Sequence, residues 1–442
     1  MTAPRLTREL GLTSAALLVV GGIIGSGIFF TPAEVARALP GPGAILAVWI
    51  VGGLIALAGA LTYAELGAMM PDAGGGYVYI REAFGPLPAF LCGWMTLASI
   101  ASGAIAAVAM GFAGYAERYV SLAPVGGRLG LAALTIIALT LTNILGVKPG
   151  AFLQNALTLA KSAALFALIG LGLLKWGVIA PLPVVGAPVP PDLLTGAATA
   201  FVAVLFTIGG WQQMNMVAGE IKDPQRTIPR ALVIGIGVVI AIYLGANLVY
   251  LHALGRDGLA ASAAVAADTA ERLAGPAGAS AITVAAMISI LGFTGVALLT
   301  NARMLFALGA DGAFLTSAAR VHPRFGSPHV ALALLGGWSL ALLLGTRGEI
   351  GALLSGVVFA DWIFFGLGAA SVLVLRRTRP ELERPYRVTG YPVMPVLFVL
   401  AAAVGVVSAY VSSLRTSLFG TALLGLGAAV YWWATRRARR AA

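Results

Sequence analysis

One stretch of the sequence combines glycine, serine and apolar residues in a pattern that could bind a small zwitterion. The run from Gly21 to Gly27 reads Gly-Gly-Ile-Ile-Gly-Ser-Gly and lies inside a long apolar segment. Each glycine destabilises a helix interior by about 1 kcal/mol relative to alanine, so the run predicts a helix that is unwound near its middle. Unpaired backbone N–H and C=O groups are costly in lipid, and a bound zwitterion would satisfy groups of both kinds.

The two ends of such a break would attract opposite charges. Backbone N–H groups of Ser26, Gly27 and Ile28, next to Gly25, would start the second half-helix, whose positive dipole end suits a carboxylate. Carbonyl groups near Ile23 would accept hydrogen bonds from an ammonium group. Close packing of small residues against a neighbouring helix is the alternative explanation, and it explains this run about equally well when the run is taken alone.

A second glycine interruption favours a binding site. Gly209 and Gly210 lie within another apolar segment, just after Phe206. Paired interruptions at matching positions of two halves of a transporter point to its substrate site. The carbonyls of Phe206 and Gly209 would then add acceptors for an ammonium group.

Lys161 is the most informative charged residue, because it lies in mid-segment with eight or more mainly apolar residues on each side. A lysine at that depth costs at least about 3 kcal/mol, and its default interpretation is functional. Extension of the side chain to the membrane surface is hard to reconcile with this position. A buried lysine can also release its proton, so Lys161 could serve as a fixed charge or as a proton carrier.

The elements that position these residues are membrane-spanning helices. The chain has 442 residues, of which 59% are hydrophobic and 10% charged, against about 25% charged in soluble proteins. Its apolar runs reach the roughly 20 residues that a spanning helix needs, and they are continuous, unlike the alternating strands of a membrane barrel. We therefore expect an all-α membrane protein in the lipid bilayer.

Twelve spans are predicted, and the distribution of charge places both termini in the cytoplasm. We expect the membrane to be the inner membrane of a bacterium. Of 28 lysines and arginines, 19 fall in the predicted cytoplasmic segments and 8 outside, and Lys161 lies within a span. This explains the net charge of +11 without nucleic acid. The predicted spans are 14–38, 43–70, 86–116, 128–146, 153–176, 196–217, 228–252, 278–308, 329–345, 351–375, 393–411 and 416–434.

The spans divide into two repeats of five, which are inverted because five spans reverse the orientation of the chain. Residues 1–13 would form a cytoplasmic N-terminus, 14–176 the first repeat and 196–375 the second. Residues 393–434 would add two accessory spans, and 435–442 a basic cytoplasmic tail.

Five motifs, in this order, resemble those of the APC superfamily, and more specifically the L-type amino acid transporters (light chains of heteromeric transporters) and their bacterial homologues. The motifs are Gly22–Phe29, Leu61–Gly67, Gly74–Phe90, Leu205–Pro229 and Arg379–Pro385. The resemblance implies the LeuT-type fold of five plus five inverted helices with two more, in which helices 1 and 6 are unwound.

The resemblance also implies a role for each matching residue. Backbone N–H groups of Ser26 and Gly27 would bind the substrate carboxylate, and the carbonyls of Ile23, Phe206 and Gly209 the amine. Phe206 would also be the aromatic gate over the substrate; a phenylalanine facing lipid or core is the alternative.

In these transporters a lysine of the fifth span occupies the place of sodium in sodium-coupled relatives. Lys161 would therefore contact the Gly25 region and bridge it to the eighth span, where the sequence offers Thr294 as a partner.

Two departures from the light chains matter. The loop around Glu117 to Arg128 has no cysteine, and Cys92 is the only cysteine of the chain, so no heavy chain linked by a disulfide is expected. Asp361 stands where the light chains have an asparagine that faces the substrate. It could attract a cationic side chain or a proton, or it could be paired and structural.

The sequence therefore predicts a secondary active transporter of L-amino acids that works by alternating access, with sodium-independent exchange of neutral amino acids as the leading hypothesis. A proton-coupled symporter and an exchanger that accepts cationic amino acids or polyamines through Asp361 are the alternatives. No nucleophile–base pair or metal-ligand cluster lies within the spans, so neither an enzyme nor a metal or cofactor site is predicted.

Overall fold

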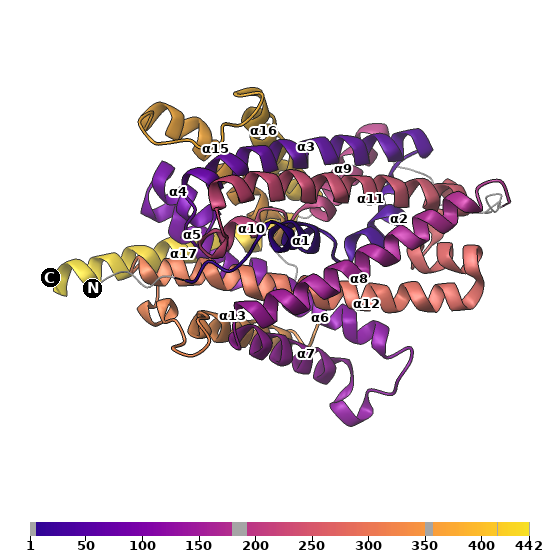
Figure 1. The fold of residues 1–442 in the computed structure, drawn as a ribbon, viewed down its shortest axis with the longest axis horizontal. Coiled ribbons are helices and arrows are strands. Elements are labelled where there is room, and N and C mark those ends of the chain that lie inside the picture. The colour runs from indigo at the N-terminus through magenta and orange to yellow at the C-terminus, as the bar shows by residue number, and fades with distance from the viewer. Residues whose placement is uncertain (1–5, 179–191, 350–356, 413, 442) are drawn as a thin grey trace.

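Long helices that run roughly along one axis build the protein (Figure 1). The structure is a computed structural model that describes residues 6–178, 192–349, 357–412 and 414–441. Within these ranges the ordered elements are helices, and the one β-bridge joins Leu10 to Ile221. The helices are α1 (Leu12–Ile23), α2 (Gly27–Ala38), α3 (Pro42–Met69), α4 (Gly76–Phe84), α5 (Pro86–Met95), a π-helical turn (Thr96–Ile100), α6 (Ala101–Ala116), α7 (Gly127–Ile144), α8 (Val147–Leu174), α9 (Leu193–Ile208), α10 (Gln213–Met216), α11 (Pro224–Ala261), α12 (Val265–Ala310), α13 (His329–Gly345), α15 (Val357–Thr378), α16 (Val393–Ser412) and α17 (Leu414–Ala441), with 3₁₀ turns at Ala123–Val125, Ala218–Glu220 and Thr316–Ala319.

The predicted all-α membrane class is confirmed. In the described ranges ten helices are long and apolar enough to cross a membrane, and the bent pair α1–α2 makes an eleventh candidate. The apolar helix α13 has 17 residues, short of the roughly 20 that a span needs. The full count of twelve therefore stays a prediction.

Several boundaries differ from the predicted ones. Helix α11 begins before and ends after the predicted span 228–252, and α12 begins well before 278. The C-terminal end of α11 and the N-terminal part of α12 are separate helical pieces, joined to the rest at Gly255 and Gly275, where φ is near +70° and the helix is kinked. Helix α17 continues to Ala441, so the predicted tail extends a helix. Residues 351–356 of the tenth predicted span lie outside the described ranges.

The pair α1–α2 lies in the middle of the helix assembly (Figure 1). Helix α1 packs against α8, α11 and α12, so a polar group at its end has protein neighbours rather than lipid. Prolines in the first turn begin α3, α5 and α11, a position at which the missing N–H of proline has no cost.

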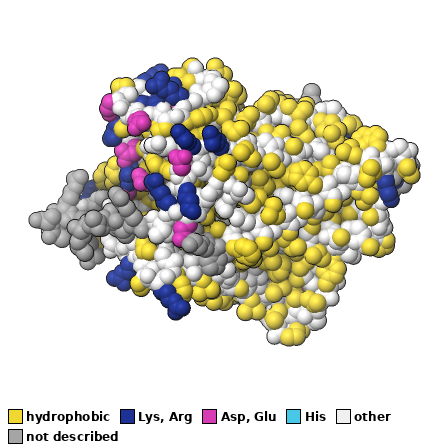
Figure 2. Space-filling view, viewed as in Figure 1, with side chains coloured by type: hydrophobic (Ala, Val, Ile, Leu, Met, Phe, Trp, Pro, Cys, Tyr) yellow, Lys and Arg dark blue, Asp and Glu magenta, His cyan; other side chains and the backbone are white. Residues whose placement is uncertain are grey.

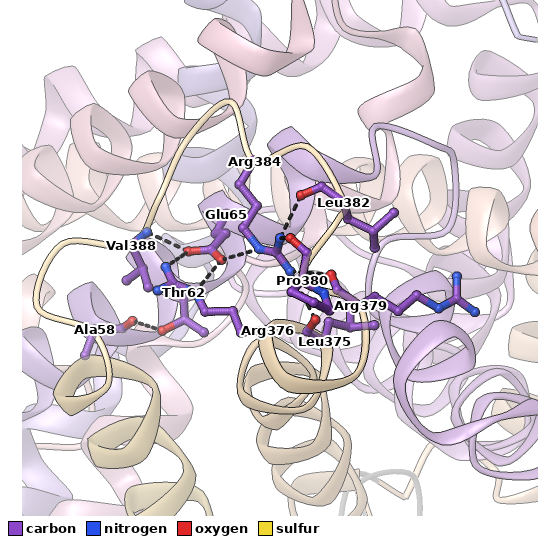
Figure 3. Close-up of polar contacts among 10 residues, drawn as sticks. All are labelled: Ala58, Thr62, Glu65, Leu375, Arg376, Arg379, Pro380, Leu382, Arg384 and Val388. Atoms are coloured by element: carbon purple, nitrogen blue, oxygen red, sulfur yellow. Dashed lines mark hydrogen bonds and ion pairs between the residues drawn. The ribbon is translucent and has the colours of Figure 1, made fainter.

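Charged side chains gather at one end of the molecule, the end at which both chain termini lie, while apolar side chains cover most of the rest of the visible face (Figure 2). At this end Glu65 of α3 is almost fully buried. Its carboxylate accepts hydrogen bonds from Arg376 (2.6 and 2.9 Å) and from the Val388 N–H (2.7 Å), and Arg384 lies at 3.6 Å (Figure 3). Glu65 thus ties α3 to α15 and to the loop that follows it.

A second ion pair at the same end is buried completely. Arg303 of α12 donates to both carboxylate oxygens of Glu220, at 2.6 and 3.2 Å, and both side chains have 0% exposure. The backbone of Glu220 accepts hydrogen bonds from the N–H groups of Glu9 and Leu10, and Lys222 donates to the Leu10 carbonyl. The segment before α1 is therefore joined to the turn after α10, which is itself held to α12.

Candidate substrate-binding site

The first helix break lies between Ile23, the last residue of α1, and Gly27, the first of α2, and the two helices meet at 41°. Side chains from three other helices satisfy its carbonyl groups. Lys161 donates to the carbonyls of Gly21 (2.9 Å) and Ile24. Ser289 lies 2.9 Å from the Gly25 carbonyl, and the Tyr243 hydroxyl lies 3.2 Å from the Ile23 carbonyl.

The second break separates α9, which ends at Ile208, from α10, which begins at Gln213. Gly210 has a φ of +106°, and a Cβ atom there would lie 2.1 Å from the carbonyl oxygen of Gly22. A Cβ atom on Gly22 would in turn lie 2.8 Å from the Gly210 carbonyl oxygen. Only glycine fits at both positions, so the two breaks touch backbone to backbone.

A cavity of about 400 Å³ opens beside the two breaks, within the size range of ligand pockets. Most of the predicted site residues line it, and they are Ile23, Gly25, Ser26, Gly27, Phe206, Gly209 and Asp361. Helices α5, α6, α12 and α15 supply most of the remaining wall, much of it apolar. Ile28 does not line the cavity, because its side chain is fully buried against the apolar core.

The N-terminus of α2 is the part of the break that remains available to a ligand. The first N–H groups of a helix have no acceptor within that helix, and they carry the positive end of its dipole. Gly27 and its neighbour Ser26 border the cavity at this point. The position suits an anionic group such as a carboxylate.

The predicted acceptors for an ammonium group differ in how free they are. The Ile23 carbonyl already accepts from the Gly25 N–H (2.8 Å) and from Tyr243, and a carbonyl oxygen has two lone pairs. The Phe206 carbonyl accepts from the Gly209 N–H at 3.3 Å and retains one lone pair. Phe206 is thus the better-placed acceptor of the two.

The side chain of Phe206 is 47% exposed and lines the cavity directly before the second break. An aromatic ring at this place can cover or uncover a ligand without moving the backbone. Its role as a gate stays a prediction.

Lys161 lies behind the break rather than in the cavity, and it is fully buried. Thr294, the partner suggested from the sequence, donates instead to the Ile290 carbonyl of its own helix. The hydroxyl of α12 that reaches the break is Ser289, which contacts the carbonyls of both Ile24 and Gly25. Sequence reasoning named Thr294 and not Ser289, because both are small hydroxyl residues in one apolar helix and the side of that helix that faces α1 is not readable from the sequence.

Tyr243 is a further residue that the sequence did not single out. Its hydroxyl lies 3.2 Å from the Ile23 carbonyl and 3.4 Å from the Thr207 carbonyl. It therefore joins the two breaks from α11. The only signal for it is a tyrosine inside an apolar span, and such a tyrosine needs a hydrogen-bond partner when it is buried.

The sequence profile of the amino acid permease family matches residues 10–429. The chain belongs to this family. This permease is 34% identical to the b(0,+)-type amino acid transporter 1 of Homo sapiens over 413 residues, which cover 92% of this chain and 83% of the relative. The predicted resemblance to the APC superfamily is thereby confirmed, and the family is one of transport proteins rather than enzymes.

Two other relatives align with a similar share of this chain. The Large neutral amino acids transporter small subunit 2 of Mus musculus is 32% identical over 404 residues, or 89% of this chain and 75% of the relative. The Serine/threonine exchanger SteT of Bacillus subtilis (strain 168) is 31% identical over 397 residues, or 89% of each chain. This permease therefore resembles both light-chain transporters and a bacterial exchanger.

Substitutions at the α2 N-terminus test whether backbone or hydroxyl groups bind the ligand. A Cβ atom on Gly27 would lie 2.6 Å from Thr207 Cγ2, so Gly27→Val should displace the helix start and lower uptake of labelled amino acid at least about tenfold. Ser26→Ala keeps the backbone and should change uptake less than about threefold. Gly114→Val, in α6 with no atom within 4 Å of the added Cβ, is the control. A larger effect of Ser26→Ala than of Gly27→Val would contradict the backbone site.

Proposed function

We propose that this permease is a secondary active transporter that exchanges L-amino acids, neutral ones among them, across the inner membrane by alternating access and without sodium. The observation that carries the proposal is the position of the Lys161 ammonium group. It is bonded to the Gly21 and Ile24 carbonyls on the carbonyl side of the break. A mobile cation at this place would leave the protein in each cycle, but a lysine remains.

The fixed charge favours exchange over ion-driven uptake. The carbonyls of an unwound helix need a positive or hydrogen-bonding partner in a membrane interior, and here Lys161 and Ser289 supply it permanently. No ion then has to bind before the substrate. The name of the Bacillus relative, a serine/threonine exchanger, agrees with this mode.

The two broken helices supply the groups that a zwitterion requires. The α2 N-terminus borders the cavity and would bind the carboxylate, while the carbonyls of Phe206 and Gly209 would accept from the amine. The wall between α6, α12 and α15 would receive the side chain. Its largely apolar residues suit neutral side chains, as the name of the large neutral amino acids relative also suggests.

The architecture we infer is twelve spans in two inverted repeats of five plus two, with both termini in the cytoplasm. Basic residues concentrate at the end where the termini lie (Figure 2), and basic residues favour the cytoplasmic side.

An impermeant thiol reagent should therefore label an Arg379→Cys variant in a Cys92→Ser background only from the cytoplasmic side. Labelling from the outer side of intact cells would contradict the proposed orientation and place this end of the protein outside.

Proton-coupled uptake is the second candidate. Among the described residues no carboxylate forms an ion pair with Lys161, so its ammonium group has no fixed counter-ion in this part of the structure. An inward proton gradient imposed on empty proteoliposomes distinguishes the two modes. Accumulation of amino acid driven by that gradient would favour symport, and its absence favours exchange.

Exchange predicts trans-stimulation. Proteoliposomes loaded with unlabelled L-amino acids should take up the same labelled amino acid at least about tenfold faster than empty ones, because the loaded carrier returns with substrate bound. Uptake should be equal in sodium and in choline buffers. Equal uptake by loaded and empty vesicles would refute the exchange mode.

Removal of the Lys161 ammonium group should disable transport without unfolding the protein. Each buried carbonyl left without a partner costs about 1–3 kcal/mol, so Lys161→Ala should lower exchange at least about tenfold. Lys175→Ala, on the exposed end of the same helix, is the matched control and should keep the wild-type rate. Size-exclusion chromatography verifies folding of both, and a folded Lys161→Ala variant with wild-type exchange would disprove the role.

A further inference from the structure

The wall that α5 and α6 give to the cavity contains the π-helical turn at Thr96–Ile100. Within this turn the Ala101 N–H donates to the Thr96 carbonyl, five residues earlier rather than four. A π-helical turn adds one residue to an otherwise α-helical segment, and such turns are rare and frequent at functional sites. Thr96 and Ile100 both line the cavity, so the extra residue lies on its wall.

Two side chains donate to carbonyl groups of the turn. The Ser102 hydroxyl, with 0% exposure, donates to the Leu97 carbonyl at 2.7 Å, again five residues earlier. The indole N–H of Trp338 in α13 lies 3.3 Å from the Ala98 carbonyl. By contrast, the buried hydroxyl of Ser339 donates four residues back along its own helix, the usual pattern for a helical serine. Ser102 is therefore fitted to the wider register of the turn.

The extra residue decides which side of α6 faces the cavity, because each residue of an α-helix turns the chain by about 100°. Between Cys92 and Tyr115 a regular α-helix would rotate the cavity-facing row of residues by about 140°, whereas one absorbed residue reduces that rotation to about 40°. The row thus stays on one side of the helix over its whole length. Its members include Cys92, Thr96, Ala101, Ala104, Gly111 and Tyr115.

The part of α6 that faces the cavity after the turn consists mainly of small residues. Ala101, Ala104 and Gly111 line the cavity there. The opposite side, with Ile105 and Ala109, is buried in a cluster that α12 and α13 share. The orientation of α6 therefore leaves space in the cavity and places a branched side chain in the core.

Loss of the turn would narrow the cavity. If these residues formed a regular α-helix while α5 stayed in place, each position on α6 would be taken by the preceding residue of the sequence. Ile100 would then replace Ala101, and Met110 would replace Gly111. One methylene in an apolar pocket changes discrimination between substrates by about 10–200-fold, so the largest substrates would lose affinity first.

We propose that Ser102 and Trp338 are positioning residues that hold the π-helical turn, and that the turn sets the largest amino acid side chain that the permease accepts. Neither side chain lines the cavity, so both act through the backbone of the turn. The inference rests on the proposed function, because it takes the cavity as the substrate site. It adds the element that determines the permitted size of the side chain.

A straight-chain ligand series tests the inference. The affinities of the purified permease for L-alanine, L-norvaline and L-norleucine are measured from ligand-dependent thermal stabilisation. The wild-type protein should bind all three. Ser102→Ala combined with Trp338→Phe should lower the ratio of norleucine to alanine affinity at least about tenfold, while alanine affinity changes less than about threefold. An unchanged ratio, an equal loss of both ligands, or a wild-type protein that binds alanine but not norleucine overturns the inference.

A deletion separates the register of the helix from a merely structural role of the two donors. Deletion of Ala98 removes the extra residue, so a regular α-helix keeps the same residues on the cavity without a π-helical turn. Added to the variant that lacks both donors, the deletion should restore the wild-type ratio, and a ratio that stays low overturns the inference. Ser339→Ala combined with Trp432→Phe removes a buried hydroxyl and an exposed indole outside the cavity and should leave the ratio unchanged.

The outcome is separable from that of the proposed function, because affinity is measured without transport. Absence of trans-stimulation in the wild-type protein would refute the exchanger and leave the affinity ratio as a test of the turn. Trans-stimulated exchange with an unchanged ratio in the variant would leave the exchanger intact and refute the role of the turn. If the variant that lacks both donors does not fold, deletion of Ala98 from the wild-type sequence still decides, since it should preserve the ratio and a change would overturn the inference.

Discussion

The rest of the site depends on one constraint, which is that the peptide groups released by a broken helix must find partners inside the membrane. At the first break the protein itself supplies partners for the carbonyl groups but not for the N–H groups at the start of α2. Lys161, Ser289 and Tyr243 reach the carbonyls from α8, α12 and α11, while the start of α2 borders the cavity. The carbonyl groups of the break are thus bonded to protein side chains, while the start of α2 is available to a ligand. This gives one end of the cavity the positive potential of a helix N-terminus. Three helices far apart in the sequence must assemble around α1 before that end exists.

The contact between Gly22 and Gly210 places the second helix break directly against the first. Their backbones approach so closely that a methyl group on either residue would overlap the carbonyl of the other. This proximity lets a single hydroxyl, that of Tyr243, lie within hydrogen-bond reach of carbonyls on both broken helices. A small ligand in the adjoining cavity can therefore touch both helices at once. The two broken helices therefore meet beside the cavity, and a shift of the backbone at Gly22 would displace the backbone at Gly210.

The sequence was sufficient for features that rest on local chemistry. Continuous apolar runs predicted the spans, and clustered glycines predicted the helix interruptions. A mid-span lysine predicted a functional charge, while its contact with the break was expected only from the resemblance to the L-type transporters. Features that depend on which side of a helix faces which neighbour were not accessible. Ser289 and Thr294 lie on the same helix, and only the packing of α12 against α1 selects Ser289. Ile28 faces the core rather than the cavity for the same reason. The Arg303–Glu220 pair was missed because its partners are 83 residues apart and each looks like an ordinary end-of-helix charge.

The short pairing between the segment before α1 and the turn after α10 has a mechanical consequence. Three backbone hydrogen bonds join residues 9–10 to residues 220–222, and the buried carboxylate of Glu220 holds the turn to α12 through Arg303. Because of these contacts, a tilt of α1 at this end would either break the three hydrogen bonds or displace the turn as well. Deletions or fusions close to Glu9 would therefore disturb the connection between α1 and the turn after α10, even though Glu9 itself precedes α1.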